Sequence, residues 1–208
     1  IHIDLFGGHL RGSPNGNKWI LVITDSFTKY AICVPLPNKE AVTVAKAIFD
    51  RWFVLMGIPC QVLSDNGKEF SNKVMDELAT LLGFQQLKTS SFHPQTNSSA
   101  ESYNRTMIKY LTQALCETTT LDWEEELTSL QFTYNTHVHK STLESPFFLT
   151  FLHHARTPEF DMEVPATRYS DSWPTEAFLR MQKAYKLAKE NNEEANRKKV
   201  HKAENLAK

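Results

Sequence analysis

The chain has few cysteines, no long apolar run and almost no net charge, and each of these absences argues against a class of protein. The three cysteines, Cys33, Cys60 and Cys116, are odd in number, widely spaced and set among apolar residues. This pattern argues against a disulfide framework and favours a reducing compartment. No apolar run approaches the roughly 18 to 20 residues of a membrane span, and no signal-peptide pattern opens the chain. We therefore expect no membrane partner.

The net charge of −1 conceals an uneven distribution of charge. Residues 1–170 contain 14 Lys and Arg against 18 Asp and Glu, a net charge of −4, whereas the remainder contains 9 against 6, a net charge of +3. A chain of 208 residues is long enough to bury one substantial core. We predict a core domain over residues 1–160, a linker over 161–172 and a helix over 173–208. The missing initiator Met leads us to expect a fragment of a longer polyprotein or multidomain protein.

Hydrophobic periodicity predicts an α/β fold. Strands are expected over residues 1–6, 19–25, 30–36, 61–64 and 84–88. Helices are expected over residues 41–56, from an N-cap at Ser71 to Leu82, from Tyr103 to Leu115, from about Asp122, over 147–152 after Ser145-Pro146, and from about Pro174 to Leu206. A meander followed by helix, strand, helix and strand predicts a mixed sheet with helices on both faces.

Three acidic residues carry the chemistry that the chain suggests. Asp4 lies in the first predicted strand, Asp65 ends the fourth, and Glu101 begins a predicted helix. Each also has a simple structural explanation: an Asp at a strand edge, a tight Asp-Asn-Gly turn, and an acid that favours the helix dipole. Together, two strand-borne Asp and a helix-borne Glu, with 35 residues between the last two, can hold paired divalent metal ions for phosphodiester chemistry.

Several motifs around these acids resemble the catalytic core of retroviral and long-terminal-repeat retrotransposon integrases, over residues 1 to about 160. The matching stretches are His2-Ile3-Asp4, Val22 to Lys29, Ser64 to Phe70, Phe92 to Asn97 and Glu101 to Asn104. The stretches Asp25 to Tyr30 and Lys140 to Pro146 are closest to those of gypsy-class elements. The resemblance implies a ribonuclease-H-like fold, a five-stranded mixed sheet flanked by helices, here with a C-terminal helical extension. Its first strand is central, with the fourth beside it.

The resemblance also implies an activity and a cofactor. Integrases of this kind carry out metal-dependent 3′ processing and strand transfer of retroelement DNA ends into target DNA. Asp4, Asp65 and Glu101 would be both the catalytic residues and the ligands of two Mg²⁺ ions, for which Mn²⁺ can substitute. Two alternatives stay open. One is a domesticated, catalytically silent scaffold for DNA or protein binding, and the other is a nuclease of the same superfamily.

Further residues around the three acids are candidates for nucleic-acid contacts. They are Asn66, Phe92, His93, Pro94, Gln95, Asn104, Arg105 and Lys109. Arg105 and Lys109 share a helix face with Glu101 and can reach phosphates, although the same pattern is typical of an ordinary solvated face. The loop aromatic and amide can stack on unpaired nucleotides, or the loop can simply be stiffened by Pro94.

The same resemblance implies partners and a location. The expected partners are double-stranded DNA ends, target DNA, further copies of the chain and a host targeting factor. The expected location is nuclear, after a cytoplasmic phase in a retroelement particle.

Overall fold

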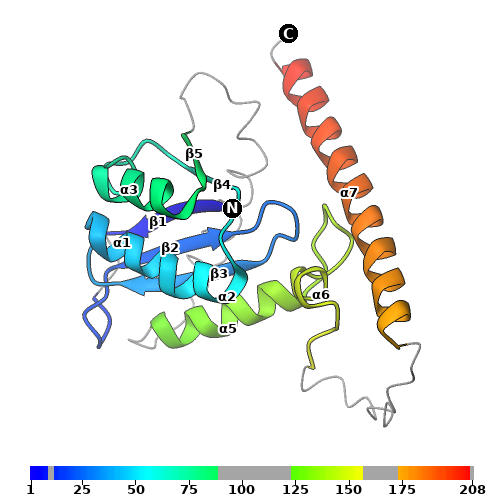
Figure 1. Cartoon of the computed structure of the whole chain (residues 1–208), viewed down its shortest axis with the longest axis horizontal. Helices are drawn as coiled ribbons and strands as arrows, with labels where there is room; N and C mark the ends of the chain where they lie inside the picture. Colours follow the sequence, from blue (N-terminus) through cyan, green and yellow to red (C-terminus); the bar gives the residue numbers. More distant parts are fainter. Residues whose placement is uncertain (9–11, 89–122, 157–172, 207–208) are drawn as a thin grey trace. The chain divides into compact units, whose positions relative to one another are not determined.

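The structure is a computed structural model that describes residues 1–8, 12–88, 123–156 and 173–206 (Figure 1). The described residues divide into two compact units. The first draws on 1–26 and 31–132, and the second on 27–30 and 133–208. Within the described ranges, no helix combines the length and the apolar character needed to cross a bilayer. The predicted domain boundaries at residues 160 and 172 fall in an undescribed range and stay predictions.

One five-stranded mixed sheet organises the first unit (Figure 1). Its strands are β1 (His2–Gly7), β2 (Trp19–Thr24), β3 (Ala31–Leu36), β4 (Gln61–Ser64) and β5 (Gln85–Lys88), in the order β3-β2-β1-β4-β5. The pairs β1/β2 and β2/β3 are antiparallel, whereas β1/β4 and β4/β5 are parallel. The predicted mixed sheet, with the first strand central and the fourth beside it, is confirmed.

Both faces of this sheet are covered at β2. Successive side chains of a strand point to opposite faces, yet all residues from Ile20 to Thr24 are at most 3% exposed. A strand of this kind needs apolar side chains throughout, which explains its continuous run of Ile, Leu and Val. On the neighbouring β3, burial raises the pKa of the Cys33 thiol to about 12. The thiol therefore stays protonated and acts as a core side chain.

The edge strand β3 is protected by a proline and by a helix. The Cys33 backbone N–H points away from β2 and donates to Gln131 Oε1 at 2.7 Å. Residues two apart present their backbone groups to the same side, so Pro35 lies at this outer edge, where its missing N–H breaks no ladder bond. Gln131 belongs to α5 (Trp123–Thr136), which begins close to the predicted start near Asp122 and covers an edge that could otherwise pair with another chain.

The helix predicted over residues 41–56 is interrupted by a π-helical turn. It consists of α1 (Ala41–Ile48), the π-helix η1 (Phe49–Phe53) and α2 (Val54–Met56). The wider turn moves the buried face by one residue. Phe49 is 40% exposed, whereas Phe53 is buried and packs edge-to-face on Phe84 at 5.4 Å.

The helix α3 (Lys73–Leu82) begins one residue later than predicted. Its N-cap is Asn72, whose Oδ1 accepts from the Met75 backbone N–H at 3.1 Å, so the predicted N-cap at Ser71 is wrong. An Asn side chain at this position has the same geometric reach as the predicted Ser and caps as well. Gly83 ends the helix in the left-handed conformation, as expected for a C-terminal stop.

The second unit is built around two helices. They are α6 (Pro146–Phe151), capped by the predicted Ser145, and α7 (Trp173–Leu206). Leu149 of α6 packs with Ala184 and Ala188 of α7, and the Tyr185 ring meets Phe27 edge-to-face at 5.3 Å. The predicted C-terminal helical extension is therefore present. Two apolar side chains of this helix, Phe178 and Leu187, are about half exposed, at 52% and 47%.

Candidate functional site

Asp4 lies on β1, and Asp65 directly follows the adjacent parallel strand β4. His2 of β1 is paired with Leu63 of β4, and the Leu63 N–H donates to the Ile1 carbonyl at 2.8 Å. Continuing this register by two residues places Asp65, at the end of β4, beside Asp4. Residues in register on neighbouring strands share a face of the sheet. The fold therefore brings the first two predicted acids together although they are far apart in the sequence.

Local hydrogen bonds hold each of these two carboxylates. Asp4 Oδ1 accepts from the Leu5 backbone N–H at 2.8 Å, and Asp65 Oδ1 accepts from the Gly67 backbone N–H at 2.9 Å. The second contact is an Asx turn, in which the side chain bonds two residues ahead. Within the described part of the chain, Asp65 Oδ2 takes part in no hydrogen bond and is free to act as a ligand.

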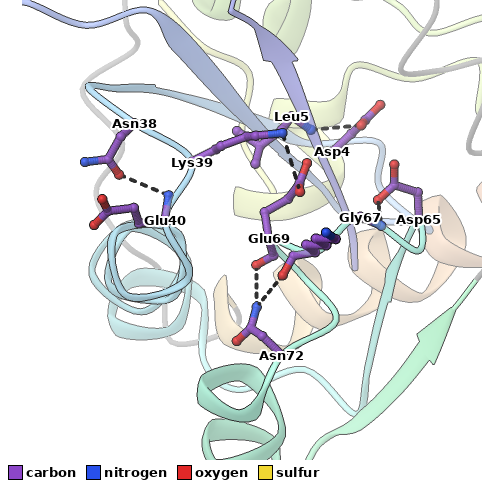
Figure 2. A network of polar contacts seen from close by, with 10 residues as sticks. Asp4, Leu5, Asn38, Lys39, Glu40, Asp65, Gly67, Glu69 and Asn72 are labelled. Carbon is purple, nitrogen blue, oxygen red and sulfur yellow. Dashed lines mark hydrogen bonds and ion pairs between the residues drawn. The ribbon is translucent and has the colours of Figure 1, made fainter.

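A third carboxylate, that of Glu69, converges on the same turn. A Cβ atom at Gly67 would lie 2.9 Å from Asp65 Oδ1 and 3.0 Å from Glu69 Oε1. Because both oxygens lie within 3.0 Å of one point, the two carboxylates are close neighbours. Only glycine leaves room for both side chains here. Figure 2 shows Asp4, Asp65 and Glu69 around this turn.

A lysine faces the opposite side of the Glu69 carboxylate. Lys39 Nζ lies 3.9 Å from Glu69 Oε2 (Figure 2). The same ammonium group lies 5.1 Å from the centre of the Trp19 ring. The Glu69 side chain is 15% exposed and that of Lys39 is 51% exposed. The aromatic face attracts the cation and restricts where it can go. Glu69 thus presents Oε2 to Lys39, whereas its Oε1 lies 3.0 Å from the Cβ position at Gly67.

The turn that carries Asp65 and Glu69 is anchored at its far end. Asn72 Nδ2 donates to the carbonyls of Lys68 and Glu69, at 3.0 and 2.8 Å. The Phe70 side chain is 1% exposed and fixes the turn to the core. Asn66, a predicted nucleic-acid contact, lies in the same turn and is exposed.

The two described acids fit a divalent cation. Carboxylate oxygens are the ligands that Mg²⁺ prefers, and two neighbouring carboxylates repel each other unless a cation lies between them. Across the described residues, no group of three or more His, Cys, Asp or Glu side chains is arranged to hold a metal. The remaining predicted site residues lie outside the described residues: Phe92, His93, Pro94, Gln95, Glu101, Asn104, Arg105 and Lys109.

Residues 1–94, which contain the whole sheet and both aspartates, match the family model described as integrase core domain. The chain therefore contains sequence of an integrase core domain. Its integrase core is of the type found in retroviruses and retrotransposons, since its relatives come from both.

Relatives of this integrase core occur in transposon and retroviral polyproteins. The chain is 28% identical over 185 residues to the retrovirus-related Pol polyprotein from transposon 412 of Drosophila melanogaster, covering 88% of this chain and 15% of the polyprotein. It is 30% identical over 159 residues to gypsy retrotransposon integrase-like protein 1 of Bos taurus, covering 76% of this chain and 31% of that protein. The chain thus spans less than a third of the length of these relatives.

Solved integrase structures share the fold. The catalytic core domain of the HTLV-2 integrase, in complex with magnesium, has a TM-score of 0.57 at 15% identity, covering 72% of this chain and 93% of that one. The matching chain in the simian T-cell lymphotropic virus intasome, solved with the PP2A regulatory subunit B56 gamma, has a TM-score of 0.60 at 16% identity, covering 81% and 59%. The ribonuclease-H-like fold predicted for this integrase core is confirmed.

Three residues of the site were not predicted from the sequence as functional. They are Lys39, Gly67 and Glu69. Glu69 and Gly67 lie in the Ser64 to Phe70 stretch, and an acid four residues beyond Asp65 in a glycine turn is the signal that could have drawn attention to them. Lys39 is distant from Glu69 in the sequence, and only the folded chain reveals the pair.

Proposed function

We propose that this chain is the catalytic core of an integrase that carries out 3′ processing and strand transfer of retroelement DNA ends. The observation that supports this most directly is the parallel β1/β4 register, which brings Asp4 beside Asp65 in a chain that contains sequence of an integrase core domain. Glu101 is proposed as the third acid. The nucleophile would be water in 3′ processing and the new 3′-hydroxyl in strand transfer.

Asp4, Asp65 and Glu101 would hold two Mg²⁺ ions. When bound, such ions activate the attacking oxygen and stabilise the leaving oxygen of an in-line displacement. The magnesium complex of the HTLV-2 core, which shares this fold, supports the choice of metal. The protein orients the Asp65 carboxylate through the hydrogen bond from the Gly67 N–H to Oδ1, so that Oδ2 would be the oxygen that binds the metal.

The proposed substrate contacts are DNA phosphates and terminal bases. Asn66 is exposed beside Asp65, and the other proposed contacts are Phe92, His93, Pro94, Gln95, Asn104, Arg105 and Lys109. We also propose that several copies of the chain assemble on the DNA, with a host targeting factor, in the nucleus. The simian T-cell lymphotropic virus intasome, which contains B56 gamma, supports such an assembly by analogy of fold.

The test is a strand-transfer assay with a pre-processed DNA end. This chain and a longer polypeptide that contains it are each incubated with target DNA in Mg²⁺ or Mn²⁺, and joined products are resolved on gels. We expect joined products that fall at least 100-fold in Asp4→Asn, Asp65→Asn and Glu101→Gln, because each substitution removes a metal ligand (on the order of the 10²-fold or greater losses typical of site residues).

Two results would contradict the proposal. In the first, neither polypeptide joins DNA in either metal, and DNA binding is the same with and without metal and in the Asp65→Asn variant. This result would support a silent scaffold. The other is cleavage without joining, which would support a nuclease. Retention of full joining by Glu101→Gln would remove the third acid from the mechanism.

A further inference from the structure

Glu69 is a carboxylate beside the proposed metal ligands for which the proposed mechanism has no role. Its Oε1 and Asp65 Oδ1 both lie within 3.0 Å of the Cβ position at Gly67, so the two carboxylates are close neighbours. Its backbone carbonyl is held by Asn72 at 2.8 Å, and its side chain is only 15% exposed. A largely buried carboxylate so close to a second one is unfavourable unless nearby cations balance the charge.

The chain supplies one of these cations itself. Lys39 Nζ is 3.9 Å from Glu69 Oε2 and rests 5.1 Å from the centre of the Trp19 ring. At 3.9 Å the pair is at the long limit of an ion pair, so Lys39 neutralises Glu69 only partly. The other oxygen, Oε1, lies 3.0 Å from the Cβ position at Gly67, in the turn that carries Asp65. Lys39 attracts Oε2 and so opposes movement of the Glu69 carboxylate away from this position.

We propose that Glu69 is a positioning residue for Asp65. Its charge strengthens the binding of a divalent cation by Asp65 without Glu69 being a ligand, and Lys39 on Trp19 limits that effect by partly neutralising Glu69. This inference rests on the proposed metal-dependent function, because it concerns the same site. It adds a fourth carboxylate and a restraining lysine that the three predicted acids do not include.

The two partners of the Lys39–Glu69 pair then have opposite effects on metal binding. Glu69→Gln removes a negative charge near the cation and weakens binding. Lys39→Met removes a positive charge, leaves Glu69 unbalanced and strengthens binding. A pair with a merely structural role would behave differently, because breaking it from either side would disturb the turn in the same way.

The experiment measures Mn²⁺ binding by the unmodified chain and its variants from the electron paramagnetic resonance signal of free Mn²⁺. We expect the concentration for half-saturation to rise roughly three- to tenfold in Glu69→Gln and to fall in Lys39→Met, as a unit charge near a divalent ion implies when water and salt screen the interaction. In the variant with both substitutions, the concentration of Mn²⁺ for half-saturation should be close to that of the unmodified chain. Charge-matched controls are Glu77→Gln and Lys73→Met, an exposed pair on α3 at 3.5 Å, which should leave the midpoint unchanged.

The outcomes separate this inference from the proposed function. If Asp65→Asn abolishes Mn²⁺ binding while Glu69→Gln and Lys39→Met leave the midpoint unchanged or shift it in the same direction, the role of Glu69 is wrong and the metal site stands. If Asp65→Asn binds Mn²⁺ as the unmodified chain does, the metal site itself is wrong and the inference falls with it. Melting curves without metal check that each variant folds. Should Glu69→Gln not fold, Lys39→Met decides alone, because only tighter binding supports the proposal.

Discussion

At Gly67 the site leaves no space for a side chain. Its backbone N–H holds Asp65 Oδ1 at 2.9 Å, and the position of its missing Cβ is taken by the ends of Asp65 and Glu69. The backbone here is not in the left-handed region, so an alanine is conformationally permitted. The requirement for glycine therefore comes from the two carboxylates and not from the turn itself.

Gly67→Ala should weaken metal binding while changing the stability of the fold little. The new Cβ would lie 2.8 Å from Glu69 Cδ and 2.9 Å from Asp65 Oδ1, so one carboxylate must move. Both atoms are at the ends of side chains that can rotate, and we expect the free energy of unfolding to change by about 1 kcal/mol or less. We expect Mn²⁺ binding to weaken about tenfold, as when a neighbour of a metal ligand is lost.

Chemical denaturation and Mn²⁺ titration of the same preparation check this prediction. Gly12→Ala is the matched control, because a Cβ there approaches only Lys18 Cε, at 3.8 Å. A Gly67→Ala variant with unchanged Mn²⁺ affinity would mean that the two carboxylates need not converge on this turn.

At the scale of secondary-structure elements, Glu124 connects α5 to the segment between β1 and β2. Its carboxylate accepts hydrogen bonds from Ser13 Oγ, from Asn17 Nδ2 at 2.9 Å and from Asn15 Nδ2 at 3.0 Å. Ser13 Oγ in turn accepts from the Asn17 backbone N–H at 3.0 Å. A first-turn glutamate, at a position where its charge favours the helix dipole, thus also holds a loop from the opposite half of the sequence.

Removing this contact should destabilise the fold and change its dependence on pH. We expect Glu124→Ala to lower the free energy of unfolding by about 1 to 2 kcal/mol, a value reduced for partial exposure to solvent. Burial by itself raises the pKa of Glu124, but hydrogen bonds from Ser13, Asn17 and Asn15 outweigh it and leave the pKa below its ordinary value of 4.5.

A lowered pKa in the folded state means that the unfolded chain binds more protons as pH falls. The stabilisation is therefore fully present above about pH 4.5, and it is lost as the pH falls through the lower folded-state pKa. Urea denaturation at neutral and acidic pH measures the free energy of unfolding. Acidification should lower this free energy less in Glu124→Gln than in the unmodified chain. Glu125→Gln, an exposed neighbour in the same turn, is the control. Equal losses in both variants would contradict a role for Glu124.

At the scale of the whole molecule, the second unit depends on close approach between α6 and α7. Ala188 and Leu149 are completely buried, and Ala184 is 9% exposed. Asn191 Nδ2 donates to the Thr142 carbonyl at 3.2 Å, and Asn192 Nδ2 donates to the Phe27 carbonyl at the same distance. Small side chains allow the helices to pack, and the two amides satisfy backbone carbonyls beside them.

Enlarging the small residue at this contact should loosen α7. Ala188→Leu adds three carbon atoms to a filled space, for which overpacking costs about 1 to 3 kcal/mol. We expect faster hydrogen exchange of α7 backbone amides near residue 188, measured by mass spectrometry, with β2 amides as the internal reference. Gln182→Leu, on the exposed side of the same helix, should leave exchange unchanged. Unchanged hydrogen exchange in Ala188→Leu would mean that α6 and α7 can accommodate the larger side chain without loss of stability.

Most elements of the fold could be predicted because periodicity and capping are local properties. The ends of the five strands were predicted closely, and Ser145 with Pro146 marked the start of α6 correctly. The errors have local causes as well. The π-helical turn at Phe49–Phe53 interrupts the helix predicted over residues 41–56, and sequence period does not reveal a single wider turn.

The candidate site was predicted only in part. The sequence by itself determined the order of the elements and the residue types that suit a divalent metal, because both depend on neighbours along the chain. Only the tertiary structure decided that Asp65 lies beside Asp4, that Glu69 shares the space at Gly67, and that Lys39 and Trp19 face it from other strands and loops. Such contacts follow from strand register and from the direction of each side chain, and residues far apart in sequence acquire these relations only when the sheet has formed.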